Sequence, residues 1–305
     1  MKTFFVVNPK SANGATGRRW GELVASIART LSDFGVEFTR GEMDAMHITR
    51  TAIKSGYECI VAVGGDGTIN EVVNGFFEDG KVLNPAAALG VLPRGTGGDF
   101  RKSFDWDLDS DAAIHRLKTP DTRPFDVGLL EFLGHDGSPQ RRYFANICSF
   151  GASGLVDQEV NQTSKVFGGT VSFLLGSLKA LSKYSDQKVS VSFDDKPEEL
   201  LDVTTLSVAN GKYFGGGMKV APEADVSDGI FDVTVWSGYG LSDFVLKSKG
   251  VYSGAHVGWK GTRTLRAKKV AARSDERVLI DCDGEQPGTL PCTMTILPSA
   301  IRLKV

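Results

Sequence analysis

The sequence lacks several features that would settle its class at once. It has no run of about eighteen apolar residues, the length that a membrane-crossing helix needs. Its first apolar segment ends at Asn8-Pro9, too early for a secretory signal. None of the four cysteines belongs to a CxxC or CxxH pair, which argues against a zinc ribbon, and the chain length does not indicate a disulfide framework. We therefore expect a cytoplasmic protein in a reducing compartment.

An excess of positive charge is also missing. The chain of 305 residues carries 35 Lys and Arg against 37 Asp and Glu, a net charge of −2, which argues against a globally basic nucleic-acid binder. Internal repeats and Pro/Ser linkers are absent too, while apolar residues at 41% and charged residues at 24% are typical of folded proteins. At roughly 150 residues per domain, the length indicates two domains joined tightly.

The first part of the chain alternates strand and helix patterns. Apolar runs and helical spacings follow one another up to about residue 92, and the order βαβαβ predicts a parallel sheet. The expected strands are 3–8, 36–39, 59–63 and 86–92, and the expected helices are 20–34, 45–56 and 69–76.

From about Arg123 onwards, short alternating runs separated by turn residues predict antiparallel β-structure. Two helices are expected within it, at 165–184 and 242–256. The sequence patterns thus predict an α/β domain with a parallel sheet (1–124) followed by an antiparallel β-rich domain (125–305).

Glycine, at 36 residues, is the abundant residue type, and its clusters carry the chemistry. Gly64-Gly65-Asp66-Gly67-Thr68 lies between a buried strand and a helix start, where backbone N–H groups can receive a phosphate. A carboxylate there favours a magnesium ion or a proton acceptor beside the phosphates; a plain turn with Asp66 as helix cap is the alternative. Polar loops at 8–14 and 93–100 also follow strands and should share this sheet edge. Neither a Walker A loop nor a GxGxxG fingerprint occurs.

Taken together, these loops resemble the diacylglycerol-kinase catalytic domain of bacterial lipid kinases, a family related to sphingosine and ceramide kinases and more distantly to NAD kinases. The resemblance rests on five ordered segments and covers nearly the whole chain. It implies that the N-terminal α/β domain is Rossmann-like, that the C-terminal domain is β-sandwich-like, and that ATP and acceptor meet in a cleft between the two domains. The segments are NPKSANG (8–14), GGDGTINEVVNG (64–75), LGVLPRGTGGDF (89–100), GGGMKVAPEADVSDGIFDV (215–233) and DGEQPG (283–288).

The resemblance implies site residues and cofactors. ATP is expected as phosphoryl donor with Mg²⁺, and Asp66 is the expected magnesium and phosphate residue. Either Asp283 or Glu285 is the expected general base, and the sequence does not decide between them. The implied ATP-binding residues are Asn8, Thr39, Gly64, Gly65, Asp66, Gly67, Thr68, Ile69 and Thr96.

Further expectations follow from the same resemblance. A structural magnesium is implied at Asp225, Asp228 and the backbone of Ile230, with an ordinary Asp-Gly turn as the alternative. Glu71 and Asn74 are expected to support the site, or else to lie on a solvated helix face. Two residues depart from the family pattern: Gly98 replaces the usual Asn, and Arg94 replaces the usual apolar residue.

A basic stretch between Leu241 and Arg273 stands out from the rest of the chain. Eight Lys or Arg face Asp243 alone there, a local net charge of +7, which suits an anionic membrane as well as an ordinary solvated face. The basic residues are Lys247, Lys249, Lys260, Arg263, Arg266, Lys268, Lys269 and Arg273.

The function expected is an ATP- and magnesium-dependent kinase that phosphorylates the hydroxyl of a membrane lipid such as diacylglycerol. Its expected partners are this lipid and the inner membrane surface, with which it makes peripheral contact, and no nucleic acid; a homodimer stays open. The alternatives are an NAD kinase-like enzyme and a catalytically silent nucleotide- or lipid-binding regulator.

Overall fold

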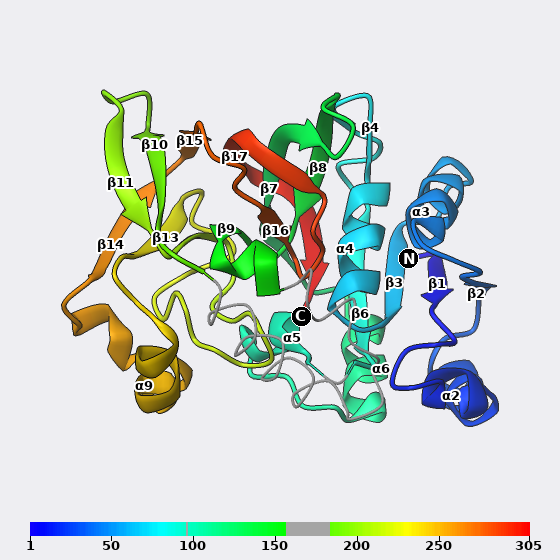
Figure 1. Cartoon of the computed structure of the whole chain (residues 1–305). Helices are drawn as coiled ribbons and strands as arrows, with labels where there is room; N and C mark the ends of the chain where they lie inside the picture. Colours follow the sequence, from blue (N-terminus) through cyan, green and yellow to red (C-terminus); the bar gives the residue numbers. More distant parts are fainter. Residues whose placement is uncertain (96, 157–183) are drawn as a thin grey trace.

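The computed structural model describes residues 1–95, 97–156 and 184–305, so Thr96 and nearly all of the helix expected at 165–184 lie outside it. Within these ranges, a parallel sheet lies at one end of the molecule and two antiparallel β-layers lie at the other (Figure 1). The prediction of an α/β domain followed by an antiparallel sandwich is confirmed. The boundary expected between residues 124 and 125 falls inside a strand and stays a prediction.

The α/β half has four parallel strands in the order β2-β1-β3-β6. Its strands and helices fall close to the expected ranges because the apolar residues follow strand and helix periods. The elements are β1 (Thr3–Val7), α1 (Ala15–Arg18), α2 (Trp20–Thr30), β2 (Phe34–Phe38), α3 (Asp44–Lys54), β3 (Cys59–Gly64), α4 (Asp66–Gly75), β4 (Phe77–Glu78), β5 (Lys81–Val82), β6 (Ala88–Pro93), α5 (Asp99–Lys102) and α6 (Ser110–Lys118).

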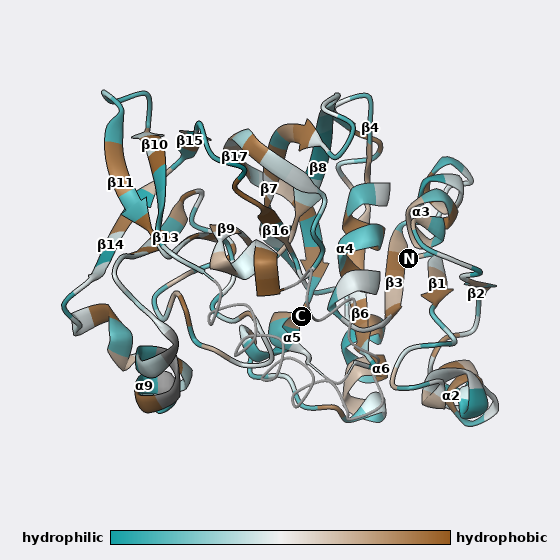
Figure 2. Cartoon of the chain, viewed as in Figure 1, coloured by the Kyte–Doolittle hydropathy of each residue, from teal (hydrophilic) through white to brown (hydrophobic). Residues whose placement is uncertain are grey.

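Both faces of the parallel sheet are covered by helices. Alternate strand residues point to opposite sides, so Val6, Ile60 and Leu89 pack with α3 and α4, whereas Phe5 and Val61 pack with α2 and α6. This is why the central strands are almost continuously apolar, as the brown colour along β3 and β6 shows (Figure 2).

The β-rich half forms a second core between two layers. A five-stranded sheet, in the order β14-β13-β12-β9-β16, packs on the antiparallel part of the large sheet. Its elements are β7 (Thr122–Gly134), β8 (Pro139–Phe144), β9 (Ile147–Gly151), β10 (Gln187–Phe193), β11 (Glu199–Val203), β12 (Thr205–Ala209), β13 (Phe231–Trp236), α9 (Leu241–Ser253), the 3₁₀-helix η2 (Ala255–Gly258), β14 (Thr262–Ala267), β15 (Lys269–Arg273), β16 (Ile280–Cys282) and β17 (Gly288–Lys304).

One strand joins the two halves, and the sequence did not indicate it. Strand β17 pairs antiparallel with β7 and β15, and its last residues, Arg302 and Leu303, pair parallel with β6. The parallel sheet of the first half therefore continues directly into the antiparallel sheet of the second. Because the two halves share backbone hydrogen bonds, they are less separate than two linked domains.

The close packing between strands β7 and β8 leads to a prediction about stability. Gly128 lies opposite Phe144, and a Cβ on Gly128 would come within 2.1 Å of the aromatic ring. We expect Gly128→Ala to lower the free energy of unfolding by about 1–3 kcal/mol, because the buried ring has to move. Chemical denaturation measures this change.

The control is a helical glycine with open space around it. No atom lies within 4 Å of a Cβ placed on Gly21 in α2, so Gly21→Ala should raise the free energy of unfolding by about 0.5–1 kcal/mol. Equal effects of the two substitutions would contradict the packing described for β7 and β8.

Candidate functional site

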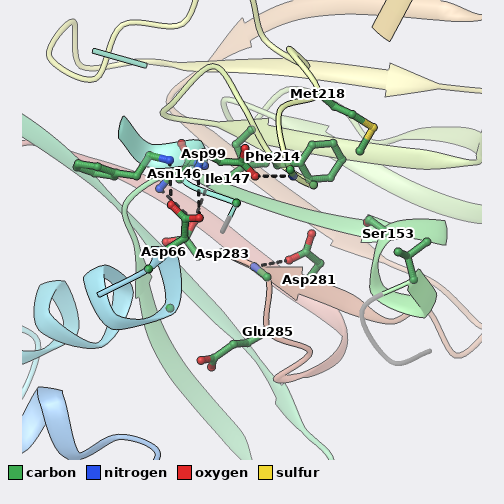
Figure 3. A pocket seen from close by; sticks show the side chains of 18 of the residues that line it. Asp66, Asp99, Asn146, Ile147, Ser153, Phe214, Met218, Asp281, Asp283 and Glu285 are labelled. Carbon is green, nitrogen blue, oxygen red and sulfur yellow. Dashed lines mark hydrogen bonds between the residues drawn. The ribbon is translucent and has the colours of Figure 1, made fainter. Parts of the chain in front are cut away.

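The carboxyl ends of three neighbouring parallel strands meet at one cavity. Strands β1, β3 and β6 end at Val7, Gly64 and Pro93, and the polar loops that follow them all contribute to its lining. The cavity has a volume of about 1080 Å³ and is closed on the other side by residues of the β-rich half, including Asp283 and Glu285. The two halves therefore share one site, as expected (Figure 3).

Two of the glycine loops touch backbone to backbone. A Cβ on Gly95 would lie 2.7 Å from the Cα of Gly65, and a Cβ on Gly64 would lie 2.4 Å from Oγ1 of Thr68. Thr68 in turn accepts a hydrogen bond of 3.1 Å from Nδ2 of Asn8 in the first loop. Glycine is thus required for the loops following β3 and β6 to approach one another, whatever ligand they bind.

Most of the expected nucleotide residues lie together in this cavity. Thr39 is not among its lining residues; its backbone N–H donates to the carbonyl of Val7 at 2.9 Å, which extends β2 along β1. Gly64 is buried beneath the loop, and Thr96 lies outside the described residues. The expected residues that line the cavity are Asn8, Gly65, Asp66, Gly67, Thr68 and Ile69.

Asp66 begins helix α4 and faces the start of helix α5. Its two carboxylate oxygens accept backbone N–H groups of Asp99 at 3.2 Å and of Phe100 at 3.0 Å. Burial and the neighbouring charge of Asp99 raise the pKa of Asp66, while these backbone hydrogen bonds act in the opposite direction. A carboxylate in this state can accept a proton or stand beside a metal ion, since each oxygen keeps a lone pair.

Asp99 is a further residue of the site, which the sequence marked only as part of its loop. Its Oδ1 pairs with Nζ of Lys102 at 2.9 Å, and its Oδ2 accepts the N–H of Gly216 at 2.7 Å. Gly215, Gly216 and Gly217 all have positive φ, a conformation that favours glycine. This triple-glycine turn thus brings the β-rich half onto the loop that follows β6.

The two departures from the family pattern have structural explanations. Gly98 has φ 62°, and Asn and Gly are the residues that adopt this left-handed conformation most readily, so the replacement preserves the turn. Arg94 is half-buried and donates to Oγ of Ser110 at 3.4 Å, at the start of α6. It is not among the residues that line the cavity.

Asp283 and Glu285, between which the sequence could not choose, have different surroundings. Asp283 accepts four N–H groups: Nδ2 of Asn70 at 2.8 Å and the backbone of Ala145 at 2.8 Å, Asn146 at 3.1 Å and Ile147 at 2.8 Å. Burial raises the pKa of Asp283 to about 6, although the four donors favour the charged form. Its carboxylate is therefore largely occupied in holding the loop between β8 and β9 (Figure 3).

Two asparagines of α4 extend this network. Asn74, expected to support the site, exchanges hydrogen bonds with the backbone of Tyr143: its Oδ1 accepts the N–H at 2.9 Å and its Nδ2 donates to the carbonyl at 2.8 Å. Asn70, which the sequence analysis did not single out, donates to Asp283 and to the same carbonyl. Both side chains are buried, so the solvated-face alternative is wrong for Asn74.

Glu285 is more exposed than Asp283 and faces the glycine loop 64–68. Its Oε1 lies 3.9 Å from where a Cβ on Gly67 would be, and its Oε2 pairs with Nη1 of Arg142. Glu71 stands nearby: it accepts the backbone N–H of Ala45 at 3.0 Å, and its pKa is raised, chiefly by burial and further by the charge of Glu285. Arg142 thus neutralises Glu285 at the cavity wall, and it was not expected from the sequence.

The segment implied to hold a structural magnesium forms a turn. Asp225 accepts the N–H and hydroxyl of Ser227, and Asp228 accepts the N–H of Ile230 and pairs with Arg266. Among the described residues, no three acidic, His or Cys side chains are arranged to hold a metal. The Arg266 guanidinium supplies the positive charge at Asp228, and the magnesium site stays a prediction.

Comparison with known proteins matches both halves of the chain. Residues 2–130 match the model of the diacylglycerol kinase catalytic domain, and residues 146–305 match that of the YegS C-terminal NAD kinase beta sandwich-like domain. A diacylglycerol kinase of Bacillus subtilis is 26% identical over 94% of this chain and 90% of its own. A protein of Chromohalobacter salexigens named "Probable lipid kinase YegS-like" is 31% identical over 76% of this chain and 70% of its own.

Solved structures share the fold. A diacylglycerol kinase from Bacillus anthracis superposes with a TM-score of 0.70 at 20% identity, covering 99% of this chain and 96% of that one. An NAD kinase from Archaeoglobus fulgidus, solved in complex with ATP, superposes with a TM-score of 0.50 at 13% identity, covering 99% and 92%. The two-domain arrangement is therefore common to both groups.

The matches group this chain with lipid kinases rather than with NAD kinases, since the catalytic-domain model and the two relatives named above are those of diacylglycerol or lipid kinases. The chain belongs to the diacylglycerol kinase family of lipid kinases.

Proposed function

We propose that this lipid kinase transfers the γ-phosphoryl group of ATP, with magnesium, to the hydroxyl of a membrane lipid such as diacylglycerol. The observation that supports this proposal most directly is the shared cavity. Three polar loops at the carboxyl edge of a parallel sheet face Glu285, which comes from the other half of the chain. A phosphate donor on one side and a proton acceptor on the other are what phosphoryl transfer to a hydroxyl needs.

The loops provide the donor side. Backbone N–H groups at the start of α4 and in the glycine turns can bind phosphate oxygens, because helix N-termini and glycine loops present unpaired donors. A protein of the same fold, the NAD kinase from Archaeoglobus fulgidus, was solved in complex with ATP, which supports ATP as the donor in this proposal. Magnesium bound with ATP would neutralise charge on the phosphate oxygens, and Asp66 is the carboxylate best placed to hold it.

Glu285 is the residue we assign as general base. It is open to the cavity, and one of its oxygens is held by Arg142 while the other faces the Gly67 loop. Asp283 has a different role in this proposal. Because its oxygens already accept four N–H groups, it positions the loop that carries Glu285.

The rest of the cavity suits an apolar acceptor. Its lining includes several apolar and aromatic side chains that lie apart from the glycine loops in the sequence, on the β-rich half. They are Val156, Phe214, Met218, Trp236, Val251 and Trp259. A nucleotide acceptor, as in an NAD kinase, would gain little from this surface, whereas an acyl chain would bury apolar area on it.

The first experiment tests the acceptor class. Purified protein is incubated with labelled ATP, magnesium and a panel of diacylglycerol, monoacylglycerol, ceramide, sphingosine and NAD. We expect phosphorylation of a lipid alcohol and none of NAD, and we expect Asp66→Asn to abolish it in a protein that still folds, as a cooperative thermal unfolding transition would show. Labelling of NAD alone would contradict the lipid acceptor, and no labelling at all would favour a silent regulator.

The second prediction separates the two acidic residues of the DGE segment. Glu285→Gln should lower kcat by about 10²-fold or more, with the Kd for ATP and the melting temperature unchanged, since a base acts only on the acceptor proton. Asp283→Asn should lower the free energy of unfolding by about 1–3 kcal/mol, because an amide group cannot accept all four N–H groups. The opposite pattern would reverse the two roles.

A third prediction concerns Arg142. Arg142→Met should lower kcat about tenfold or more at unchanged KM for ATP, since Glu285 loses the contact that orients it, and Arg142→Lys should restore part of the rate. The matched control is its neighbour Arg141, which pairs with Glu131 at the surface, so that Arg141→Met should change neither parameter. If both Met variants behave alike, Arg142 does not position Glu285.

A further inference from the structure

Helix α9 and the following η2 form one wall of the cavity. Asp243, Lys247, Val251 and Trp259 from this segment line it. The carbonyl of Val251 accepts the backbone N–H of Lys219, which ties the inner side of α9 to the β-rich half. The inner side of α9 therefore belongs to the site already described.

The outer side of the same segment carries exposed apolar side chains. Leu246 is 82% exposed and Val257 is 41% exposed. Lys249 and Lys260 are exposed as well. We refer to these four residues, Leu246, Lys249, Val257 and Lys260, as the α9 surface; hydrophobic and hydrophilic positions lie side by side on α9 in Figure 2.

The charges of the basic stretch are distributed unequally. Five of its eight cations pair with carboxylates. Four of these five cations lie on β14 or β15, and three of the four pair with acidic residues of the hairpin β10–β11. The pairs are Lys247 with Asp243, Arg263 with Glu199, Arg266 with Asp228 and Asp232, Lys269 with Asp195, and Arg273 with Glu198. Most of the local net charge of +7 is thus neutralised by carboxylates of the same molecule.

The α9 surface keeps its charge. Lys249 and Lys260 have no acidic partner within 4.0 Å in the parts of the chain that the structure describes. The single acid of the segment 241–261, Asp243, is already paired with Lys247. Unpaired cations beside exposed apolar side chains complement a layer of anionic head groups above acyl chains.

We propose that the α9 surface docks onto an anionic lipid bilayer. Leu246 and Val257 enter the interface, while Lys249 and Lys260 contact lipid phosphates. Because the inner side of α9 lines the cavity, this contact brings the acceptor site next to the membrane that contains the acceptor. The inference rests on the proposed function for its purpose, although the surface itself can be tested without catalysis.

The experiment measures co-sedimentation with vesicles of phosphatidylcholine and phosphatidylglycerol, and with vesicles of phosphatidylcholine alone. We expect binding to the anionic vesicles that weakens as salt shortens the screening length from ~8 Å at 0.15 M to ~3 Å at 1 M. Lys249→Gln with Lys260→Gln should reduce the partition coefficient about tenfold or more, since each lysine interacts with the charged leaflet. Leu246→Ser should reduce it on both kinds of vesicle.

The chain offers matched controls on the other side of the β-rich half. Lys269→Gln with Arg273→Gln removes the same formal charge from ion-paired positions, and Leu200→Ser removes an exposed leucine from β11. These variants should bind as the wild type does. Equal binding by all variants, or equal loss in the control variants, would overturn the α9 surface as the docking site.

Activity on a short-chain, soluble diacylglycerol separates this inference from the proposed function. The α9 variants should keep that activity while losing activity on vesicle-embedded lipid, since none of these side chains lines the cavity. Loss of vesicle binding in a protein that phosphorylates no lipid would refute the function and retain the surface. Unchanged vesicle binding in a protein active on the soluble lipid would refute the surface alone.

Discussion

The arrangement of the whole site depends on one buried carboxylate. Asp283 accepts N–H groups from α4 and from the chain between β8 and β9, two segments that are far apart in the sequence and far from Asp283 itself. A buried acid with several donors is stable only when all of them are in place, because each unpaired N–H would cost free energy. This requirement fixes the position of helix α4 relative to the β-rich half. Since α4 begins in the glycine loop 64–68, it also fixes Glu285 opposite that loop.

Close backbone contacts also explain why glycine and asparagine recur in the segments that form the site. Glycines at 65 and 95 let two loops touch through their backbones, and the triple-glycine turn reaches the carboxylate of Asp99. Asparagines can donate and accept at once, so Asn74 binds both backbone groups of Tyr143. In this chain, glycines and amide side chains thus do much of the assembly of the site.

Much of this could be predicted from the sequence, because strand and helix periods and ordered glycine loops are local signals. The elements of the α/β half follow from such signals. The expectation that Asp66 and Glu285 share one site comes instead from the family resemblance. Arg142, Asn70 and β17 follow from neither, since their partners lie 143, 213 and about 200 residues away along the chain. A lone arginine in a β-strand has no pattern that predicts the charge it meets. The basic stretch has the same limit, because the carboxylates that pair with several of its cations come from distant parts of the chain.

Strand β17 has a consequence for how the protein is made. Until Arg302 and Leu303 leave the ribosome, β6 has an open edge whose N–H and C=O groups are unsatisfied on one side. The α/β half therefore cannot complete its sheet until β17 has been made, even though its own residues come much earlier in the chain. Before that point β6 exposes a strand edge, at which nascent chains could pair with one another.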